Sequence, residues 1–351
     1  MSGNPLDWGR PIRSVRFGWG SIRLDLRLVA TCLVAMLLTA LLLALSLALG
    51  DYPIYPDQLW TILTGQGEGL ARTVVLDWRL PRALMALICG AGLGVAGGIF
   101  QSITRNPLGS PDVIGLSAGS YTGALIVIIL WTSSYGAVTT GALTGGLLSA
   151  AAIYFLAYRG GILGFRLIVV GIAISAMLSS VNMALLLRSD SEIALSAAVW
   201  GAGSLNGVGW DHATPAAVII CLLLAAVAFF ARDMHGIELG DDAAKALGVP
   251  VERSRFLLIG LGVALTAAIT AVAGPIAFIA LAAPQIALRL SKSQGIALFP
   301  AGCVGALLLL AADLLSQRLF APRQWPVGIM TVSIGGLYLL WLLMQQARKR
   351  S

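Results

Sequence analysis

The sequence predicts an all-α, polytopic membrane protein with about ten transmembrane helices. Hydrophobic residues make up 58% of the 351 residues, and charged residues make up only 11%. A soluble domain typically carries about 25% charged residues, so this composition excludes an ordinary globular protein. The mean hydropathy is +0.88, and apolar runs alternate with short polar joints. A helix needs about 20 apolar residues to cross the hydrocarbon core, a length that most of these runs approach.

The apolar runs define the expected helices one by one. The first run follows a basic segment and has no small-residue cleavage pattern, so it predicts a retained helix rather than a removable signal peptide. Pro284 is expected to interrupt the eighth run, because proline removes a helical hydrogen bond. The expected spans are 28–49, 83–104, 113–132, 137–157, 167–187, 213–231, 256–273, 276–290, 299–317 and 327–344.

The distribution of basic residues predicts the orientation of these helices. An even number of spans places both termini on one side of the membrane. If that side is the cytoplasm, it holds 17 of the 23 Lys and Arg residues, and the outer side holds 6. The positive-inside rule therefore selects cytoplasmic termini. The chain then divides into a cytoplasmic segment at 1–27, a transmembrane domain at 28–345 and a cytoplasmic tail at 346–351.

Glycines at four-residue spacing predict close helix packing in two neighbouring spans. They are Gly90, Gly94 and Gly98 before the polar break at 106–111, and Gly115, Gly119 and Gly123 after it. Such spacing leaves a bare stripe on one helix face, along which a second backbone can approach closely. In water, each of these glycines would cost about 0.5–1 kcal/mol relative to alanine.

The longest internal cytoplasmic joint, at 232–255, is expected to contain a short helix. The run Asp241–Leu247 begins with two acidic residues and carries Lys245 in its body, which suits the helix dipole. Gly248 and Pro250 follow and are expected to end the helix. A solvated connector would explain the polarity of this joint but would not require a capped helix between two spans.

The residue pattern excludes several classes of function. No GxxxxGK[ST] phosphate loop is present, and no motif indicates an intramembrane enzyme. The four cysteines lie in apolar runs without CxxC spacing, and neither histidine has a partner at ligand spacing, so no metal site is predicted. The net charge of +7 arises from the short joints. These charges set topology and do not predict a nucleic-acid partner.

Asp313 is the main ionisable residue within a predicted span. A charge at the bilayer midplane costs at least about 2.5–3.5 kcal/mol on insertion scales, which makes Asp313 a candidate functional residue. Alternatively, Asp313 lies near the outer interface and pairs with Arg318 or caps a helix break. Ion-coupled carriers usually need intramembrane carboxylates, and their scarcity here favours a transporter that is energised by a partner.

A series of motifs resembles one known family from 28 to 349. They are RLPR at 79–82, GAGLGVAGGIFQ at 90–101, RNPLGSPDVIG at 105–115, FRLIVVGIAI at 165–174, WGAGSLNG at 200–207, LGDDAAKALGV at 239–249, AGPIAFIALAAPQIALRL at 273–290 and WPVGIMTVSIGG at 325–336. With these motifs the chain resembles the FecCD-type permease subunits of bacterial ABC importers for ferric siderophores and cobalamin. Among them it looks most similar to the permeases for ferric enterobactin.

The resemblance implies a type II ABC importer permease in the bacterial inner membrane. Such a permease pairs with a second permease subunit, identical or different, and is not itself an enzyme. Two cytoplasmic ATPases would bind ATP and Mg²⁺, so the permease holds no cofactor directly. An external binding protein would deliver the ferric siderophore.

The resemblance also assigns roles to residues. The ATPase-coupling residues would be Leu239, Gly240, Asp241, Asp242, Ala244, Leu247 and Gly248. The inner gate would comprise Asn106, Pro107 and Leu108, with Gly164 and Phe165 as its second segment. The binding protein would dock on Arg79, Arg82 and Arg318, although the spacing around Arg318 departs from the family pattern. Gln285 follows Pro284 where the family usually has histidine.

Other functions stay open at this point. A permease of the same class could carry cobalamin or haem, which uptake assays with labelled ligands would separate. An ion-coupled secondary carrier would transport without an ATPase and would stop when the ion gradient collapses. A structural or sensory membrane protein would carry no flux at all.

Overall fold

A computed structural model describes residues 12–17, 20–158, 164–293 and 295–350 of the chain. Residues 1–11 of the predicted cytoplasmic segment and Ser351 of the predicted tail lie outside this part. Every predicted span is a helix in the structure. Seven of the helices are long and apolar enough to cross a membrane, and three apolar helices are shorter. The chain is therefore an all-α, multi-pass membrane protein, as predicted.

The ten helices that match the predicted spans keep the expected order. They are α1 (Leu26–Ala48), α4 (Leu80–Thr104), α5 (Leu116–Leu130), α6 (Tyr135–Ala157), α7 (Gly164–Arg188), α9 (Trp210–Glu238), α11 (Val251–Ala273), α12 (Ile279–Ser291), α13 (Leu298–Arg318) and α14 (Val327–Arg350).

The predicted interruption at Pro284 is wrong. Helix α12 is only 13 residues long and runs through Pro284. The chain breaks earlier, between α11 and α12, where Gly274 and Phe278 have φ angles of 67° and 71°. Because of these left-handed residues, α12 begins at Ile279 and not at 276 as predicted. Pro284 then lies in the body of a short helix, where it removes one hydrogen bond without ending the helix.

The joints contain short elements at the two ends of the bundle. The two long outer joints hold α2 (Pro56–Leu63), α3 (Gly69–Thr73), the π-helix η1 (Val74–Arg79) and α8 (Ser191–Gly201). The predicted helix in the joint at 232–255 is confirmed as α10 (Asp241–Ala246). A hairpin that the sequence analysis did not predict, β1 (Ile12–Phe17) with β2 (Gly20–Asp25), precedes α1.

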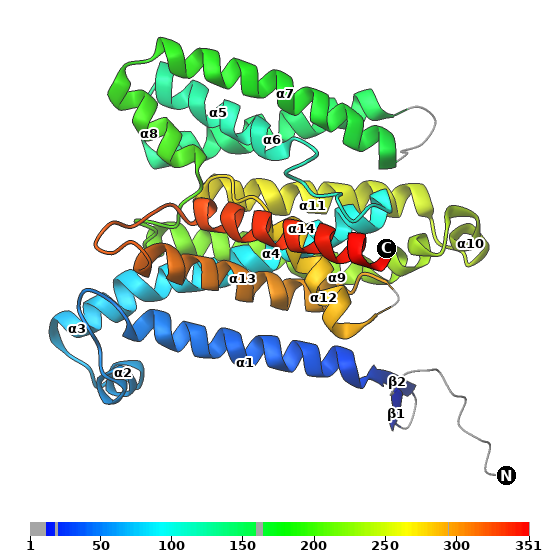
Figure 1. Cartoon of the computed structure of the whole chain (residues 1–351), viewed down its shortest axis with the longest axis horizontal. Coiled ribbons are helices and arrows are strands. Elements are labelled where there is room, and N and C mark those ends of the chain that lie inside the picture. Colours follow the sequence, from blue (N-terminus) through cyan, green and yellow to red (C-terminus); the bar gives the residue numbers. More distant parts are fainter. Residues whose placement is uncertain (1–11, 18–19, 159–163, 294, 351) are drawn as a thin grey trace.

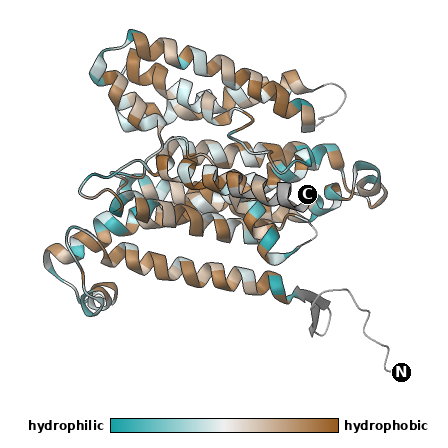
Figure 2. Ribbon diagram, in the orientation of Figure 1, coloured by the Kyte–Doolittle hydropathy of each residue, from teal (hydrophilic) through white to brown (hydrophobic). Residues whose placement is uncertain are grey.

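Helix α4 runs through the centre of the bundle (Figure 1) and packs against α13, α11, α12 and α9. Helix α1 lies along one edge, and α5, α6, α7 and α8 form a group at the other edge. Hydrophilic residues gather toward the two ends of the helices, and apolar residues line their length (Figure 2). Leu37 on α1 is 70% exposed, as expected for a side chain that faces lipid.

The glycine stripes bring helix backbones into direct contact, as the sequence predicts. A Cβ added at Gly94 of α4 would overlap the carbonyl of Ala301 on α13, and one added at Gly123 of α5 would overlap the carbonyl of Gly141 on α6. On another face of α4, a Cβ at Gly97 would overlap the carbonyl of Ala280 on α12. Close approach of this kind replaces the hydrophobic drive that is missing in lipid.

We predict that Gly94→Ala destabilises the protein. The added methyl group would force α4 and α13 apart, at a cost of about 1–3 kcal/mol for overpacking. Thermal unfolding of the purified protein in detergent measures this effect as a lower Tm.

Gly260 of α11 provides the matched control, because it is exposed and no atom lies within 4 Å of an added Cβ. Gly260→Ala should be neutral or stabilising by about 0.5–1 kcal/mol, through the lower helix propensity of glycine. Equal decreases in Tm for the two variants would contradict the close-packing interpretation.

Candidate functional site

The end of the bundle that the sequence predicts to face the cytoplasm is organised around α10. Two glycines flank the helix: Gly240 has a φ of 111° and Gly248 a φ of 81°. Positive φ angles are costly for residues with a Cβ, so glycine suits both corners of this loop. Between them, the fully buried Ala244 packs into the core of the bundle. The loop is thus held against the membrane domain at a defined position.

The solvent-exposed face of this loop carries two leucines. Leu239 and Leu247 are each 67% exposed, and Asp242 and Lys245 beside them are also exposed. Both leucines are apolar side chains that this chain leaves uncovered beside the charges of Asp242 and Lys245. The residues predicted to couple to an ATPase therefore divide into an exposed set and an inward set. The inward set consists of Asp241 and Ala244.

The carboxylate of Asp241 joins three elements. Both of its oxygens accept hydrogen bonds from the Arg255 guanidinium of α11, at 2.8 and 2.9 Å. One oxygen also accepts from Arg105, at the end of α4, at 2.8 Å. The hydrogen bond from Arg255 is the main cause that lowers the pKa of Asp241 below its ordinary value of 3.8. The carboxylate is therefore charged at neutral pH, and its contribution to stability is lost only as the pH falls through that lowered value.

The first predicted gate segment follows Arg105 directly. Arg105 caps α4 with a left-handed backbone, φ 49° and ψ 35°. The side chain of Asn106 accepts a hydrogen bond from the Leu108 N–H at 2.9 Å, which closes a tight Asx turn. Leu108 at the tip is 53% exposed, and Pro107 beside it is exposed as well.

The structure places the second predicted gate segment beside the first. Gly164 starts α7, and a Cβ at this position would lie 2.5 Å from the Thr104 Cα of α4. Only a residue without a side chain allows this approach. Phe165, the next residue, is 78% exposed. The inner ends of α4 and α7, which carry the two segments, are therefore in backbone contact.

Gln285 takes part in a buried amide network at the proline of α12. Its Nε2 donates to Gln101 Oε1 of α4 at 2.7 Å, and Gln101 Nε2 donates to the Leu281 carbonyl at 3.0 Å. This network connects the first turns of α12 to α4. A cavity of about 420 Å³ lies beside this network and is lined by Arg105, Asn106 and Glu238, among others.

At the opposite end of the bundle, Asp313 pairs with Arg82, and neither the predicted pair with Arg318 nor a cap at a helix break is formed. The Arg82 guanidinium donates three hydrogen bonds to the Asp313 carboxylate, at 2.9–3.1 Å. Asp313 is fully buried, and Gln317 donates a further hydrogen bond to it at 2.8 Å. A buried carboxylate with this many donors is a satisfied ion pair that joins α4 to α13.

The other two predicted docking arginines also bind within the chain. Arg79 donates to the carbonyls of Leu47 and Tyr52, each at 2.7 Å, and so satisfies the end of α1. Arg318 donates to the Leu49 carbonyl at 2.8 Å and forms an ion pair with Asp51 at 3.6 Å.

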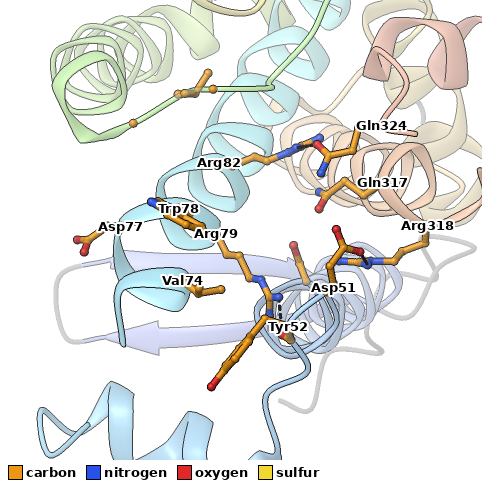
Figure 3. Close-up of a pocket in the computed structure, with 15 residues that line it drawn as sticks. Asp51, Tyr52, Val74, Asp77, Trp78, Arg79, Arg82, Gln317, Arg318 and Gln324 are labelled. Atoms are coloured by element: carbon orange, nitrogen blue, oxygen red, sulfur yellow. Dashed lines mark hydrogen bonds and ion pairs between the residues drawn. The ribbon is translucent and has the colours of Figure 1, made fainter. Parts of the chain in front are cut away.

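These three arginines help to line a cavity of about 470 Å³ (Figure 3), together with Asp51, Asp77 and other residues. In the lining of this cavity, Arg82 donates a hydrogen bond to Gln324, and Arg318 forms an ion pair with Asp51. Trp78, which also lines the cavity, is 62% exposed. No group of three His, Cys, Asp or Glu side chains in the described part of the chain could hold a metal ion.

The sequence analysis missed Arg105 and Arg255 as functional candidates. Both were counted only as basic residues that set topology. Arg105 begins the RNPLG motif, and Arg255 lies 14 residues after Asp241. The sequence held no distinguishing signal for Arg255, because many other basic residues also adjoin the apolar runs. No signal in the sequence indicated that Arg105 and Arg255 share one carboxylate.

Comparison with known proteins places these features in a family context. The model of the FecCD transport family matches residues 37–345. The chain is 48% identical to the ferric enterobactin transport system permease protein of Escherichia coli K12, over 92% of this chain and 98% of that protein. It is 34% identical to the hemin transport system permease protein of Yersinia pestis, over 79% and 84% of the two chains.

One solved structure shares the fold over nearly its whole length. This structure is described as an inward-facing conformation of a putative metal-chelate type ABC transporter. The TM-score is 0.81 at 27% sequence identity, and the match covers 90% of this chain and 99% of that one.

We predict that Asp313→Asn strongly destabilises the protein. The change removes the charge that pairs with Arg82, whose side chain is only 12% exposed. Breaking a buried ion pair costs about 3–5 kcal/mol. Thermal unfolding in detergent measures the loss.

Asp51→Asn is the matched control at the same end of the bundle. Its ion pair with Arg318 is 3.6 Å long, and the Asp51 side chain is 80% exposed, so its loss should change the stability by about 1 kcal/mol or less. A loss as large as that of Asp313→Asn would show that burial does not decide the effect.

Proposed function

The chain belongs to the FecCD transport family, and from that premise we propose that it is the permease subunit of an ATP-driven ABC importer for a ferric siderophore. The observation that carries this proposal is the loop around α10. Its buried face is fixed to the membrane domain, and its outer face presents Leu239 and Leu247 for a partner. A subunit that has no ATP site of its own needs such an exposed surface in order to bind the ATPase that drives it.

Two ATPase subunits are the proposed source of energy. They would bind ATP and Mg²⁺ and contact the exposed residues Leu239, Asp242 and Leu247. Gly240 and Gly248 would hold the loop in the shape that presents these side chains. The permease itself then carries out no catalysis and holds no cofactor. This arrangement requires α10, and with it both termini, to face the cytoplasm.

A second permease subunit, identical or different, would complete the translocation path. Many small side chains of α7 face outward from the single chain, and α7 is little buried, which leaves its surface available for a partner subunit. The segments Asn106–Leu108 and Gly164–Phe165 would close the path on the cytoplasmic side.

An external binding protein would dock over the outer cavity. Arg82 is largely committed to Asp313, and Arg318 is 30% exposed. We therefore propose that Arg79 and Arg82 shape the docking surface, and that Arg318 offers the accessible positive charge there to acidic residues of the binding protein.

The proposed cargo is ferric enterobactin or a similar ferric siderophore. This choice rests on the 48% identity to the Escherichia coli permease, which extends over 92% of the chain. Haem is the second candidate, because the hemin permease of Yersinia pestis is 34% identical. Competition between labelled ferric enterobactin and haem for uptake separates the two.

We predict that Leu247→Glu abolishes uptake of radioiron-labelled ferric enterobactin in vesicles that contain the permease pair, its ATPases and an external binding protein. A buried negative charge in place of leucine should cost about 2 kcal/mol or more at the subunit interface, which weakens assembly roughly 30-fold. Co-purification of the ATPases and uptake on addition of ATP measure the two effects.

Leu63→Glu is the control, because Leu63 is 51% exposed but lies on α2 at the opposite end of the bundle. It should retain both assembly and uptake. Uptake that continues without ATPases and collapses with the ion gradient would instead identify a secondary carrier.

A further inference from the structure

A three-way ion pair connects the coupling loop to the inner-gate segment. The Asp241 carboxylate lies at the start of α10 and accepts hydrogen bonds from Arg255 and Arg105. Arg105 also donates to the Ile237 carbonyl, near the end of α9, at 3.2 Å. In the described part of the chain, these are the polar contacts of the Arg105 side chain. Through them, the turn after α4 is joined to the loop that α9 and α10 form.

The backbone position of Arg105 makes this connection consequential. Arg105 is the last residue before Asn106–Leu108, and its left-handed conformation sets the direction in which the chain leaves α4. A residue with a Cβ adopts that conformation only at a cost. Side-chain contacts that hold Arg105 therefore also hold the start of the gate segment.

The two arginines differ in exposure, and this difference separates their roles. The Arg255 side chain is only 6% exposed, whereas that of Arg105 is 53% exposed. In the pair with Arg255 the guanidinium is buried while the Asp241 carboxylate is 39% exposed, and this pair connects α10 to α11. The pair with Arg105 is screened by solvent, so it can break and re-form at little cost.

We propose that Asp241 is a positioning residue that transmits movement of α10 to the inner gate through Arg105. This inference rests on the proposed function, and it assigns Asp241 to a linkage within the permease rather than to the ATPase contact. When an ATPase displaces α10, Asp241 moves with it and either pulls or releases Arg105. The turn at Asn106–Leu108 then changes its position.

Arg105→Gln tests this linkage, because the exposed Arg105 can lose its charge without leaving a buried charge unpaired. In the assembled complex, uptake of radioiron-labelled ferric enterobactin should fall at least roughly fivefold, while ATP hydrolysis stays within about twofold of the wild type. Arg105→Lys, which keeps the charge, should recover part of the uptake. Asp241→Asn also breaks the pair with Arg255, so it should lower uptake by itself. In a double-mutant cycle, the combined loss from Asp241→Asn and Arg105→Gln should be smaller than the sum of the two single losses.

A second readout follows the gate itself. A thiol introduced by Leu108→Cys, in a background without the native cysteines, should change its reactivity toward a membrane-impermeant reagent when ATP binds to the complex. Arg105→Gln should abolish this change while the ATPases stay bound. If Arg105 had only a structural role, Arg105→Gln would lower both the assembly of the complex and the reactivity of the introduced thiol.

Arg253→Gln is the matched control, since Arg253 is an exposed arginine on the first turn of α11, and no ion pair of its side chain is found in the described residues. It should behave as the wild type does. Full uptake by Arg105→Gln, or additive losses in the cycle, would overturn the proposed linkage. A wild-type complex without ATP-dependent uptake would overturn the proposed function instead, and the thiol readout would still test the linkage by itself.

Discussion

Direct contact between helix backbones is the constraint on which the rest of the structure depends. Lipid offers no hydrophobic drive for helices to associate, so they gain most by approaching closely enough for van der Waals contact. Helix α4 uses glycines on two faces for this purpose, with Gly94 against α13 and Gly97 against α12. Contacts on both faces therefore hold α4 closely along its length.

The two ends of α4 carry ion pairs with opposite properties. At the outer end, Arg82 binds a fully buried Asp313 with additional donors around it, and a pair of this kind is costly to break. At the inner end, Arg105 binds the partly exposed Asp241, and a pair of this kind contributes little net stability. One end of the helix is therefore fixed to α13 by a buried ion pair, and the other end contacts the loop around α10 through a partly exposed ion pair.

The inner-gate segments lie where two closely packed groups of helices meet. Helices α5 and α6 form a glycine-packed pair, to which α7 adds. Helix α4 belongs to the other group, with α12 and α13. The two groups approach each other at Thr104 and Gly164, where backbone touches backbone. A small displacement between rigid groups at this point changes the position of both segments at once, without any change within either group.

The sequence by itself determined the membrane-spanning helices, their order and the short helix α10, because these depend on local properties. Hydropathy along the chain places each apolar run, and the flanks of α10 are set by Gly240 and Gly248 within a few residues of the helix. The glycine stripes also predicted close packing, since their spacing follows from helix geometry alone. None of these properties depends on residues far away in the chain.

Only the tertiary structure decided which partners meet. Arg82 and Asp313 are 231 residues apart in the chain, and Arg105 and Asp241 are 136 residues apart. The choice of Arg82 over Arg318 for Asp313 depends on the face of α13 that turns toward α4, and Gly94 and Ala301 fix that face. Likewise, the partners of Gln285 and of the Leu281 carbonyl come from Gln101 on a neighbouring helix. Charge and hydrogen-bond partners are set by packing in three dimensions, which local patterns do not record.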